Sequence, residues 1–358
     1  MWPCARQTLL LQAALSERET AAQAFLDWCA VTDFEGSIDG ESYRLLPLAH
    51  ANLEGAAVDI PMLPLIAGVR RQAWVRSRLQ MRWAEAALAV LRDGGIPVML
   101  IKGLALATTC YADVSLRPMI DVDVLVPVDA VPDALAILAR AGLAPDPANP
   151  VSALGLGRGR PHAVELCGPA GAKLDLHCRP LTGAVEADEE RWLWDAAIPA
   201  SLGDIQLLRP APTALLTYSM IHGIWSHVHN PIRWIPDALL LLRREGQTID
   251  WDRLIAVASR YHLLARVGAA LLFLDRNFSA ELPPDVARRL GRARPTFFER
   301  IEGGGLCPGE RRPLGSGTRM RYRASLAARL LLDGRARELP VMAERFLANR
   351  LKRLWPGS

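Results

Sequence analysis

Two aspartates inside a short apolar run are the residues best suited to chemistry. Asp121 and Asp123 are separated by one valine in Asp-Val-Asp-Val-Leu-Val, residues 121–126. Side chains alternate between faces along a strand, so a strand here would point both carboxylates the same way, ~7 Å apart. Two like charges on one partly buried face repel each other and are costly to desolvate, which indicates a bound cation. Ligands that are all oxygen favour Mg²⁺ or Mn²⁺ over zinc.

A third acid repeats this pattern further along the chain. Asp175 lies between two leucines in Lys-Leu-Asp-Leu-His, residues 173–177. If this segment is a strand beside the first, Asp175 completes a cluster of three carboxylates. Such a cluster can hold two divalent ions ~3.5–4 Å apart, which clamp the attacking and leaving oxygens of a phosphoryl transfer. A charged edge strand is the alternative interpretation. His177 is interpreted as structural or as an aid to Asp175.

Two basic residues precede the first aspartate. Lys102 and Gly103 follow the apolar run 98–101 and open a predicted helix. Glycine allows the backbone to approach phosphate oxygens, and a helix N-terminus favours anions, so Lys102 is a candidate to neutralise a triphosphate. Arg117 lies four residues before Asp121 and could bind nucleotide phosphates or hold an aspartate in place. An ordinary surface arginine is the alternative. The P-loop pattern GxxxxGK[ST] is absent.

The elements that must position these residues form a small α/β core between two helical regions. Alternating or continuous apolar runs between turn residues predict five strands. They cover residues 98–101, 121–126, 162–167, 173–178 and 205–208, with a hairpin turn over 168–171. Asp129 is expected to cap a helix that ends before Gly142. The result is an α+β fold with four consecutive regions. These are a helical region (1–92), an α/β core (93–210), a second helical region (211–302) and a linker with a basic segment (303–358).

The flanking regions are helical by apolar periodicity. Before the core, helical patterns surround a looser segment that contains Gly36, Gly40, Pro47, Pro61 and Pro64. After the core, helices are expected over 213–227, 234–243, 252–261, 263–274 and 284–290.

Composition narrows the class of protein. The chain has 358 residues, of which 51% are hydrophobic, so a sizeable core can be buried. No apolar run approaches the ~20 residues that a membrane helix needs. The N-terminus lacks a basic region followed by an apolar core, so no signal peptide is predicted and a cytoplasmic location is expected. The 6 cysteines form no CxxC pair and are interpreted as reduced core residues.

The formal net charge is +4, with a basic excess near the C-terminus. It comes from Arg311, Arg312, Arg319, Arg321, Arg323 and Arg329. Such a segment can bind RNA, an acidic substrate or a membrane surface, although a solvated helix face is the simpler interpretation.

The motif from Ile101 to Val126 resembles the uncharacterised nucleotidyltransferase family of the DNA polymerase β-like superfamily. The shared pattern is KG, then a tyrosine at 111, then R-x-x-x-D-V-D-V-L-V over 117–126. The LDLH segment at 174–177 and RWIPD at 233–237 add to it. The resemblance implies a small mixed nucleotidyltransferase-type sheet between helical regions. The superfamily's usual Gly-Gly or Gly-Ser pair is Gly103-Leu104 here.

The resemblance also implies roles for the site residues. Asp121 and Asp123 would hold both metals, whereas Asp175 would hold the catalytic metal and accept the proton of the attacking hydroxyl. The Lys102-Gly103 turn would meet the triphosphate. His222, Arg233 and Asp237 become candidates to line the nucleotide pocket. Their alternatives are a core or capping histidine and an acid in a helix first turn. Trp234 is a candidate to stack on the base.

These observations predict a Mg²⁺-dependent enzyme that moves AMP from ATP to a hydroxyl or phosphate acceptor and releases pyrophosphate. The acceptor would be a peptide, a saccharide or another small molecule, and RNA is a further candidate through the basic segment. Kinase-like phosphoryl transfer and a non-catalytic nucleotide- or partner-binding module stay open as alternatives.

Overall fold

The computed structural model describes residues 2–34, 36, 38–56, 59–145, 163–168, 171–181, 187–225, 232–302, 320, 324, 325, 327, 328 and 331. The chain forms two compact units, each built from separate stretches. Unit 1 comprises Met1–Met81, Lys102–Met119 and Pro210–Arg321, and unit 2 comprises Arg82–Ile101, Ile120–Arg209 and Tyr322–Ser358. The four consecutive regions expected from the sequence stay a prediction. The basic arginines between 311 and 329 lie outside the described residues.

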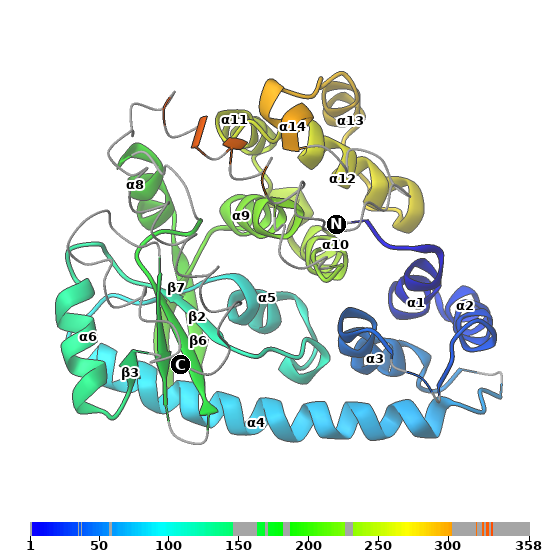
Figure 1. The fold of residues 1–358 in the computed structure, drawn as a ribbon, viewed down its shortest axis with the longest axis horizontal. Coiled ribbons are helices and arrows are strands. Elements are labelled where there is room, and N and C mark those ends of the chain that lie inside the picture. Colours follow the sequence, from blue (N-terminus) through cyan, green and yellow to red (C-terminus); the bar gives the residue numbers. More distant parts are fainter. Residues whose placement is uncertain are drawn as a thin grey trace. The chain divides into compact units, whose positions relative to one another are not determined.

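Unit 2 is built on a seven-stranded mixed sheet (Figure 1). Its strands are β1 (Met99–Leu100), β2 (Val122–Leu125), β3 (Ala144–Pro145), β4 (Ala163–Cys167), β5 (Lys173–His177), β6 (Ile198–Leu202) and β7 (Ile205–Arg209). The order across the sheet is β3-β4-β5-β2-β1-β7-β6. Strands β2 and β5 are parallel, as are β1 and β7, whereas the other neighbours are antiparallel. The five predicted strands are confirmed, and the α+β fold with them, while β3 and β6 were not expected.

Three neighbouring strands, β4, β5 and β2, separate an apolar face of the sheet from a charged one. Alternation along β2, β4 and β5 puts the apolar side chains on one side, all at most 2% exposed: Val122, Val124, Val164, Leu166, Leu174 and Leu176. Burying each of these side chains stabilises the sheet by roughly 1.5–3 kcal/mol. The residues between them, which point to the opposite face, include Asp123 and Asp175. The core thus fixes which way both carboxylates point.

Unit 2 also contains helices. They are α6 (Val131–Arg140), α8 (Ala187–Asp195) and the C-terminal part of α4 (Leu63–Asp93). A Cβ at Gly168, after β4, would lie 2.6 Å from the Trp83 ring of α4. The expected cap of α6 was wrong: the N-cap is Ala130, which makes no side-chain hydrogen bond. Gly142 adopts φ +86°, which agrees with the expected end of this helix.

Unit 1 is helical. Its elements are α1 (Ala5–Leu15), α2 (Arg18–Ala30), α3 (Gly40–Leu53), the first part of α4, α5 (Lys102–Cys110), η1 (Val114–Leu116), α9 (Pro212–Trp225), α10 (Trp234–Glu245), η3 (Gly246–Thr248), α11 (Trp251–Arg260), α12 (Leu264–Phe278), α13 (Pro284–Gly291) and α14 (Phe297–Glu302). The looser segment expected before the core was partly wrong, because α3 runs through Pro47. Its start is set by Asp39, whose side chain accepts from the Ser42 backbone N–H. The helix α14 was not predicted.

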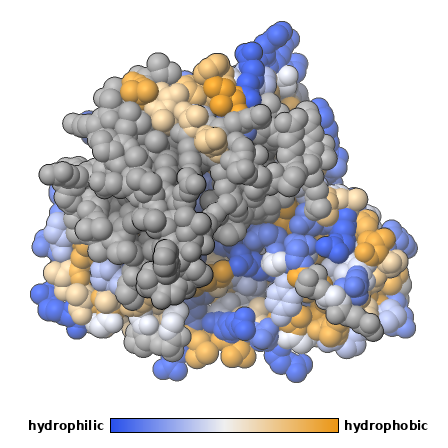
Figure 2. Space-filling view, in the orientation of Figure 1, coloured by the Kyte–Doolittle hydropathy of each residue, from blue (hydrophilic) through white to orange (hydrophobic). Residues whose placement is uncertain are grey.

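The long helix α4 carries arginines and exposed apolar side chains together. Trp74 and Leu79 are exposed, and the Arg78 guanidinium lies 5.4 Å from the centre of the Trp74 ring. Figure 2 shows hydrophobic and hydrophilic residues mixed along the lower edge, where α4 runs. None of the described helices is long and apolar enough to cross a bilayer. Of the five described cysteines, Cys178 is buried, whereas Cys4, Cys29, Cys110 and Cys167 are partly exposed.

Candidate active site

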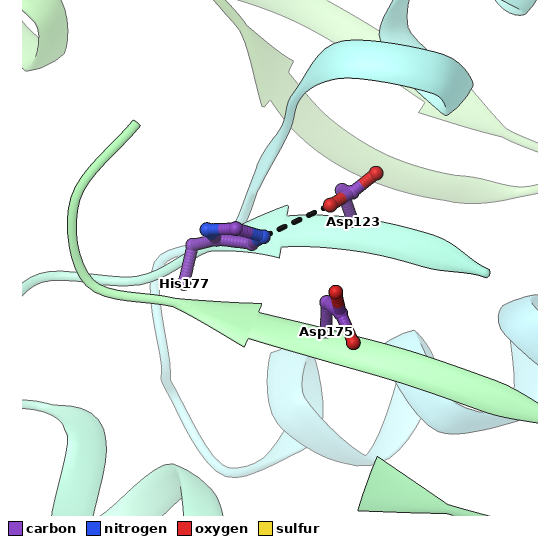
Figure 3. Close-up of side chains that lie close together, drawn as sticks. All are labelled: Asp123, Asp175 and His177. Atoms are coloured by element: carbon purple, nitrogen blue, oxygen red, sulfur yellow. Dashed lines mark hydrogen bonds and ion pairs between the residues drawn. The ribbon is translucent and has the colours of Figure 1, made fainter. Parts of the chain in front are cut away.

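Asp123 and Asp175 are register partners on neighbouring strands. Parallel pairing of β2 with β5 sets Asp123 beside Asp175 and Leu125 beside His177. Register partners in a sheet point to the same face, so the two carboxylates come together on the charged face of unit 2. Figure 3 shows the two aspartates with His177, all on this face. The adjacency of the two strands, on which the predicted cluster depended, is confirmed.

These three residues form a compact group of metal-ligating atoms. One ligand atom from each of Asp123, Asp175 and His177 lies within 4.8 Å of the others. His177 Nε2 lies 2.9 Å from Asp123 Oδ1, the hydrogen bond drawn in Figure 3. His177 is 1% exposed and Asp123 8%, whereas Asp175 is half-buried. The group therefore combines a buried imidazole and a buried carboxylate with the partly exposed carboxylate of Asp175.

The donor set fits a hard or borderline divalent cation. Two carboxylates supply the oxygen ligands that Mg²⁺ and Mn²⁺ prefer, and an imidazole nitrogen is acceptable to Mn²⁺. The separation of 2.9 Å between His177 Nε2 and Asp123 Oδ1 is close to that of adjacent ligands about 2.1 Å from one octahedral ion. His177 can equally serve as the hydrogen-bond partner that orients Asp123. Sequence reasoning treated His177 as secondary. His177 lies two residues after Asp175 on one strand, and this spacing could have indicated that both side chains point to the same face.

Asp121 lies just before β2, because the strand begins at Val122 rather than at Asp121 as expected. It is half-buried and is not a member of the three-residue group found among the described residues. Its role as a metal ligand stays a prediction.

A third acid in the row was missed from the sequence. Glu165 on β4 is the register partner of Asp175, so Glu165, Asp175 and Asp123 cross three strands on one face. Lys173 Nζ donates to Glu165 Oε1 over 2.6 Å. Both side chains are partly exposed, so this ion pair contributes little to stability.

Lys102 and Gly103 belong to unit 1 and form the first turn of α5. Lys102 has φ +46°, a left-handed conformation that costs a residue with a side chain roughly 1–2 kcal/mol. Strained backbone of this kind is concentrated at ligand sites. A Cβ at Gly103 would lie 2.7 Å from Arg117 Nη1 and 3.1 Å from Met119 Sδ. A side chain at position 103 would therefore force the Arg117 guanidinium or the Met119 thioether to shift.

The guanidinium of Arg117 is held by a buried carboxylate of unit 1. Arg117 Nε and Nη2 donate to Asp237 Oδ1 and Oδ2 over 2.7 and 2.8 Å, and the Tyr111 hydroxyl donates to Oδ1 over 2.7 Å. Arg233 Nη1 donates to the Pro118 carbonyl over 2.9 Å. The structure thus brings together four of the six predicted nucleotide-binding residues: Gly103, Arg117, Arg233 and Asp237.

Burial and charge shift several pKa values around this carboxylate. Burial, and then the negative charge of Asp237, raise the pKa of Tyr111 well above its usual value, so the hydroxyl stays protonated. The same two causes raise the pKa of Cys110 to about 12. Burial, and then the charge of Arg117, lower the pKa of Arg233.

A sequence model described as uncharacterised nucleotidyltransferase matches residues 41–279. The chain belongs to the uncharacterised nucleotidyltransferase family. It is accordingly a transferase of phosphorus-containing groups that moves a nucleotidyl group. A solution structure of the antibiotic-resistance factor ANT(2'')-Ia is 17% identical, covers 51% of this chain and 94% of its own, and has a TM-score of 0.39. No curated protein matches.

The remaining predicted residues of this nucleotidyltransferase lie as follows. His222 is an exposed residue of α9. Trp234 is 3% exposed, with its ring 5.8 Å from that of Trp2 and 6.4 Å from that of Phe273. Because its ring is buried in an aromatic cluster, the expectation that Trp234 stacks on a base was wrong.

Proposed function

We propose that this nucleotidyltransferase transfers AMP from ATP to a hydroxyl or phosphate acceptor by a two-metal mechanism. The observation that carries the proposal is the pairing of Asp123 with Asp175 on one sheet face, with His177 beside them. Asp123 and Asp175 hold Mg²⁺, with Mn²⁺ as a substitute, and Asp121 is retained as the third carboxylate. When bound, the cations supply Lewis acidity at the α-phosphate and offset charge on the departing pyrophosphate.

The protein's own groups complete the reaction. Asp175 accepts the proton as the acceptor oxygen forms its bond to the α-phosphorus and the α–β phosphoanhydride bond breaks. His177 holds Asp123 through the hydrogen bond at 2.9 Å and so keeps this carboxylate oriented. The Asp123 carboxylate therefore stays oriented toward the cation and does not rotate toward solvent.

The nucleotide is bound by the basic residues predicted from the sequence. Lys102 and Arg117 meet the phosphates, and Gly103 allows the backbone to approach them. His222, Arg233 and Asp237 are retained as residues of the nucleotide pocket. The strained backbone of Lys102 and the close contact at Gly103 support this assignment.

The acceptor class stays a proposal. A peptide, a saccharide or another small molecule that offers a hydroxyl or phosphate fits the chemistry. RNA binding by the C-terminal arginines would reveal itself as affinity that falls steeply with salt. A cytoplasmic location stays a prediction.

The test measures pyrophosphate release from labelled nucleoside triphosphates with Mg²⁺ and candidate acceptors. Release should be greatest with ATP and should vanish in Asp121→Ala and Asp123→Ala proteins that remain folded by circular dichroism. Release of ADP instead of pyrophosphate would favour the kinase-like alternative. Nucleotide binding that ignores metal and leads to no turnover would favour the non-catalytic module.

Binding of Mn²⁺, followed by electron paramagnetic resonance, separates loss of the metal from loss of the chemistry. Asp123→Asn and Asp175→Asn should each weaken Mn²⁺ binding at least tenfold, which corresponds to about 1.4 kcal/mol. Glu165→Gln is the matched control, because it removes a carboxylate from the same sheet face outside the three-residue group. Equal Mn²⁺ affinity in all three variants would refute the metal assignment.

A further inference from the structure

We infer that the outer face of α4, from Leu65 to Leu79, docks on the surface of an anionic phospholipid bilayer. This segment belongs to unit 1. Its residues lie outside the groups assigned to catalysis and nucleotide binding, so the docking surface is a separate property of the protein. Three features support it: a row of exposed apolar side chains, arginines on both sides of that row, and the absence of acidic residues from this part of the sequence.

Buried and exposed residues of α4 separate by their position on the helix. Ala73, Ser77 and Met81 follow one another at four-residue spacing and are at most 8% exposed, so they mark the face that packs on the protein. Val75 and Leu79 each lie two residues beyond a buried position, which is slightly more than half a helical turn. These two side chains therefore lie on the opposite face, which is directed to solvent.

Four large apolar side chains are exposed on this part of α4. They are Leu65 (53% exposed), Trp74 (47%), Val75 (47%) and Leu79 (66%). The segment from the first to the last of them is about 21 Å long, because a helix rises 1.5 Å per residue. Exposed apolar side chains that gather in one place, with polar residues around them, are typical of an interaction site.

Arginines lie on both sides of this apolar row. Arg71 and Arg78 are seven residues apart and share one side of the helix, whereas Arg76 lies on the other. Residues 60–84 include five arginines and no acid. Arg78 Nη2 donates to Asp113 Oδ2 over 3.0 Å, while Arg71 and Arg76 form no ion pair within the part of the chain that the structure describes. The outer face consequently keeps a positive charge.

Two aromatic residues border the same face. The Arg78 guanidinium lies 5.4 Å from the centre of the Trp74 ring. Tyr43 of α3 is 38% exposed, and its hydroxyl donates to Gln72 Oε1 over 2.9 Å. Tryptophan and tyrosine combine an apolar ring with a polar group, and for this reason they are enriched where a membrane meets water. Their place beside the arginines agrees with a helix that lies along a lipid surface.

An anionic bilayer fits this face better than other acidic partners do. A peptide docks in a groove or on a sheet edge, whereas the outer side of a single helix is convex. Single-stranded nucleic acid stacks on successive aromatic rings, but Val75 and Leu79 at the centre of this face are aliphatic. A second copy would set arginines against arginines in a two-fold interface. A bilayer accepts aliphatic side chains and attracts arginines through its anionic headgroups.

The experiment measures binding of the full-length protein to sucrose-loaded vesicles by co-sedimentation. Vesicles of phosphatidylcholine with about 30% phosphatidylserine should bind at least tenfold more tightly than phosphatidylcholine alone, and added salt should weaken the binding. The double variant Arg71→Gln/Arg76→Gln should bind at least tenfold more weakly, because it loses two charges. The double variant Val75→Ser/Leu79→Ser should also bind at least tenfold more weakly, although its charge is unchanged.

A matched control separates this face from exposed residues in general. Arg18→Gln/Val31→Ser removes an exposed arginine of α2 and the exposed valine just after this helix. It should bind vesicles as the wild-type protein does. Every variant replaces exposed side chains, so each should keep the wild-type circular dichroism spectrum. The arginine pair and the apolar pair are independent, so either one carries the test if the other fails to fold.

Fluorescence identifies the face that enters the lipid. Trp74 is the only exposed tryptophan among the described residues. Brominated phosphatidylcholine, mixed with phosphatidylserine, should quench part of the tryptophan emission of the wild-type protein. Trp74→Phe should still bind the vesicles but should lose this quenching.

Several results would overturn the inference. Vesicle binding that is absent, that does not depend on phosphatidylserine, or that is unchanged in both double variants would reject it, as would quenching that persists in Trp74→Phe. Binding of single-stranded RNA without vesicle binding would assign the face to nucleic acid, and a dimer that Val75→Ser/Leu79→Ser abolishes would assign it to a second copy. Nucleotidyl transfer in solution should be the same in all variants, so failure of the proposed function would leave this test unaffected.

Discussion

Replacing Asp175 by asparagine should make the metal-free protein more stable while removing its response to metal. Asp123 and Asp175 are register partners whose ligand atoms lie within 4.8 Å of each other. Two unit charges 4.8 Å apart, the upper bound on this separation, repel by about 3.5 kcal/mol at an effective dielectric constant of about 20. Because Asp175 is half-buried and water screens it, the gain in unfolding free energy should be about 1 kcal/mol.

Thermal unfolding with and without Mn²⁺ measures both the gain in stability and the loss of the response to metal. In EDTA, Asp175→Asn should melt about 2 °C above the wild-type protein. At a Mn²⁺ concentration 100 times its dissociation constant, the wild-type protein should gain about 2.7 kcal/mol and the variant almost nothing. Asp123→Asn should gain less in EDTA, because it also weakens the hydrogen bond to His177. Lower stability of Asp175→Asn in EDTA, or an undiminished response to Mn²⁺, would refute the reasoning.

Three further predictions concern unit 1. Gly103→Ala places a Cβ 2.7 Å from Arg117 Nη1, so guanidinium chloride unfolding should show a loss of about 1–3 kcal/mol, and an unchanged midpoint would contradict the close contact. Burial raises the pKa of Asp39, but hydrogen bonds from the Ser42 backbone and side chain, followed by weaker contacts, lower it by more. The pKa of Asp39 is therefore lowered on folding. This carboxylate therefore stabilises α3 above about pH 4, and the deficit of about 1 kcal/mol in Asp39→Ala should shrink as pH falls to 3, whereas a constant deficit would be the contrary result. With its pKa at about 12, the Cys110 thiol should react with iodoacetamide at pH 8 at least a hundredfold more slowly than in denatured protein, as peptide mapping can test.

Most strands of the sheet could be predicted from the sequence, because the patterns that indicate a strand lie within a few consecutive residues. Period-two alternation over 121–126 and 173–177, with glycines at the hairpin turn, was enough to place β2 and β5. Strand β3 has only 2 residues, whereas β6 contains Pro199, a residue that usually argues against a strand and is tolerated here on an edge strand. Helix α3 was hidden by Pro47, which usually ends a helix but is accommodated here within α3.

Long-range pairing could not be read from the sequence. Tyr111 and Asp237 are 126 residues apart, and neither has a local feature that indicates the other. The same limit applies to Glu165, whose place beside Asp175 follows from the β4–β5 register. Asp123 and Asp175 were predicted together because each lies in an apolar strand, whereas their pairing required the parallel order of β5 and β2.

The most direct test of the metal site is anomalous diffraction from crystals grown with Mn²⁺ and α,β-methylene-ATP. The account predicts an anomalous peak about 2.2 Å from carboxylate oxygens of both Asp123 and Asp175. Ordered nucleotide with no anomalous peak at these two carboxylates would contradict it.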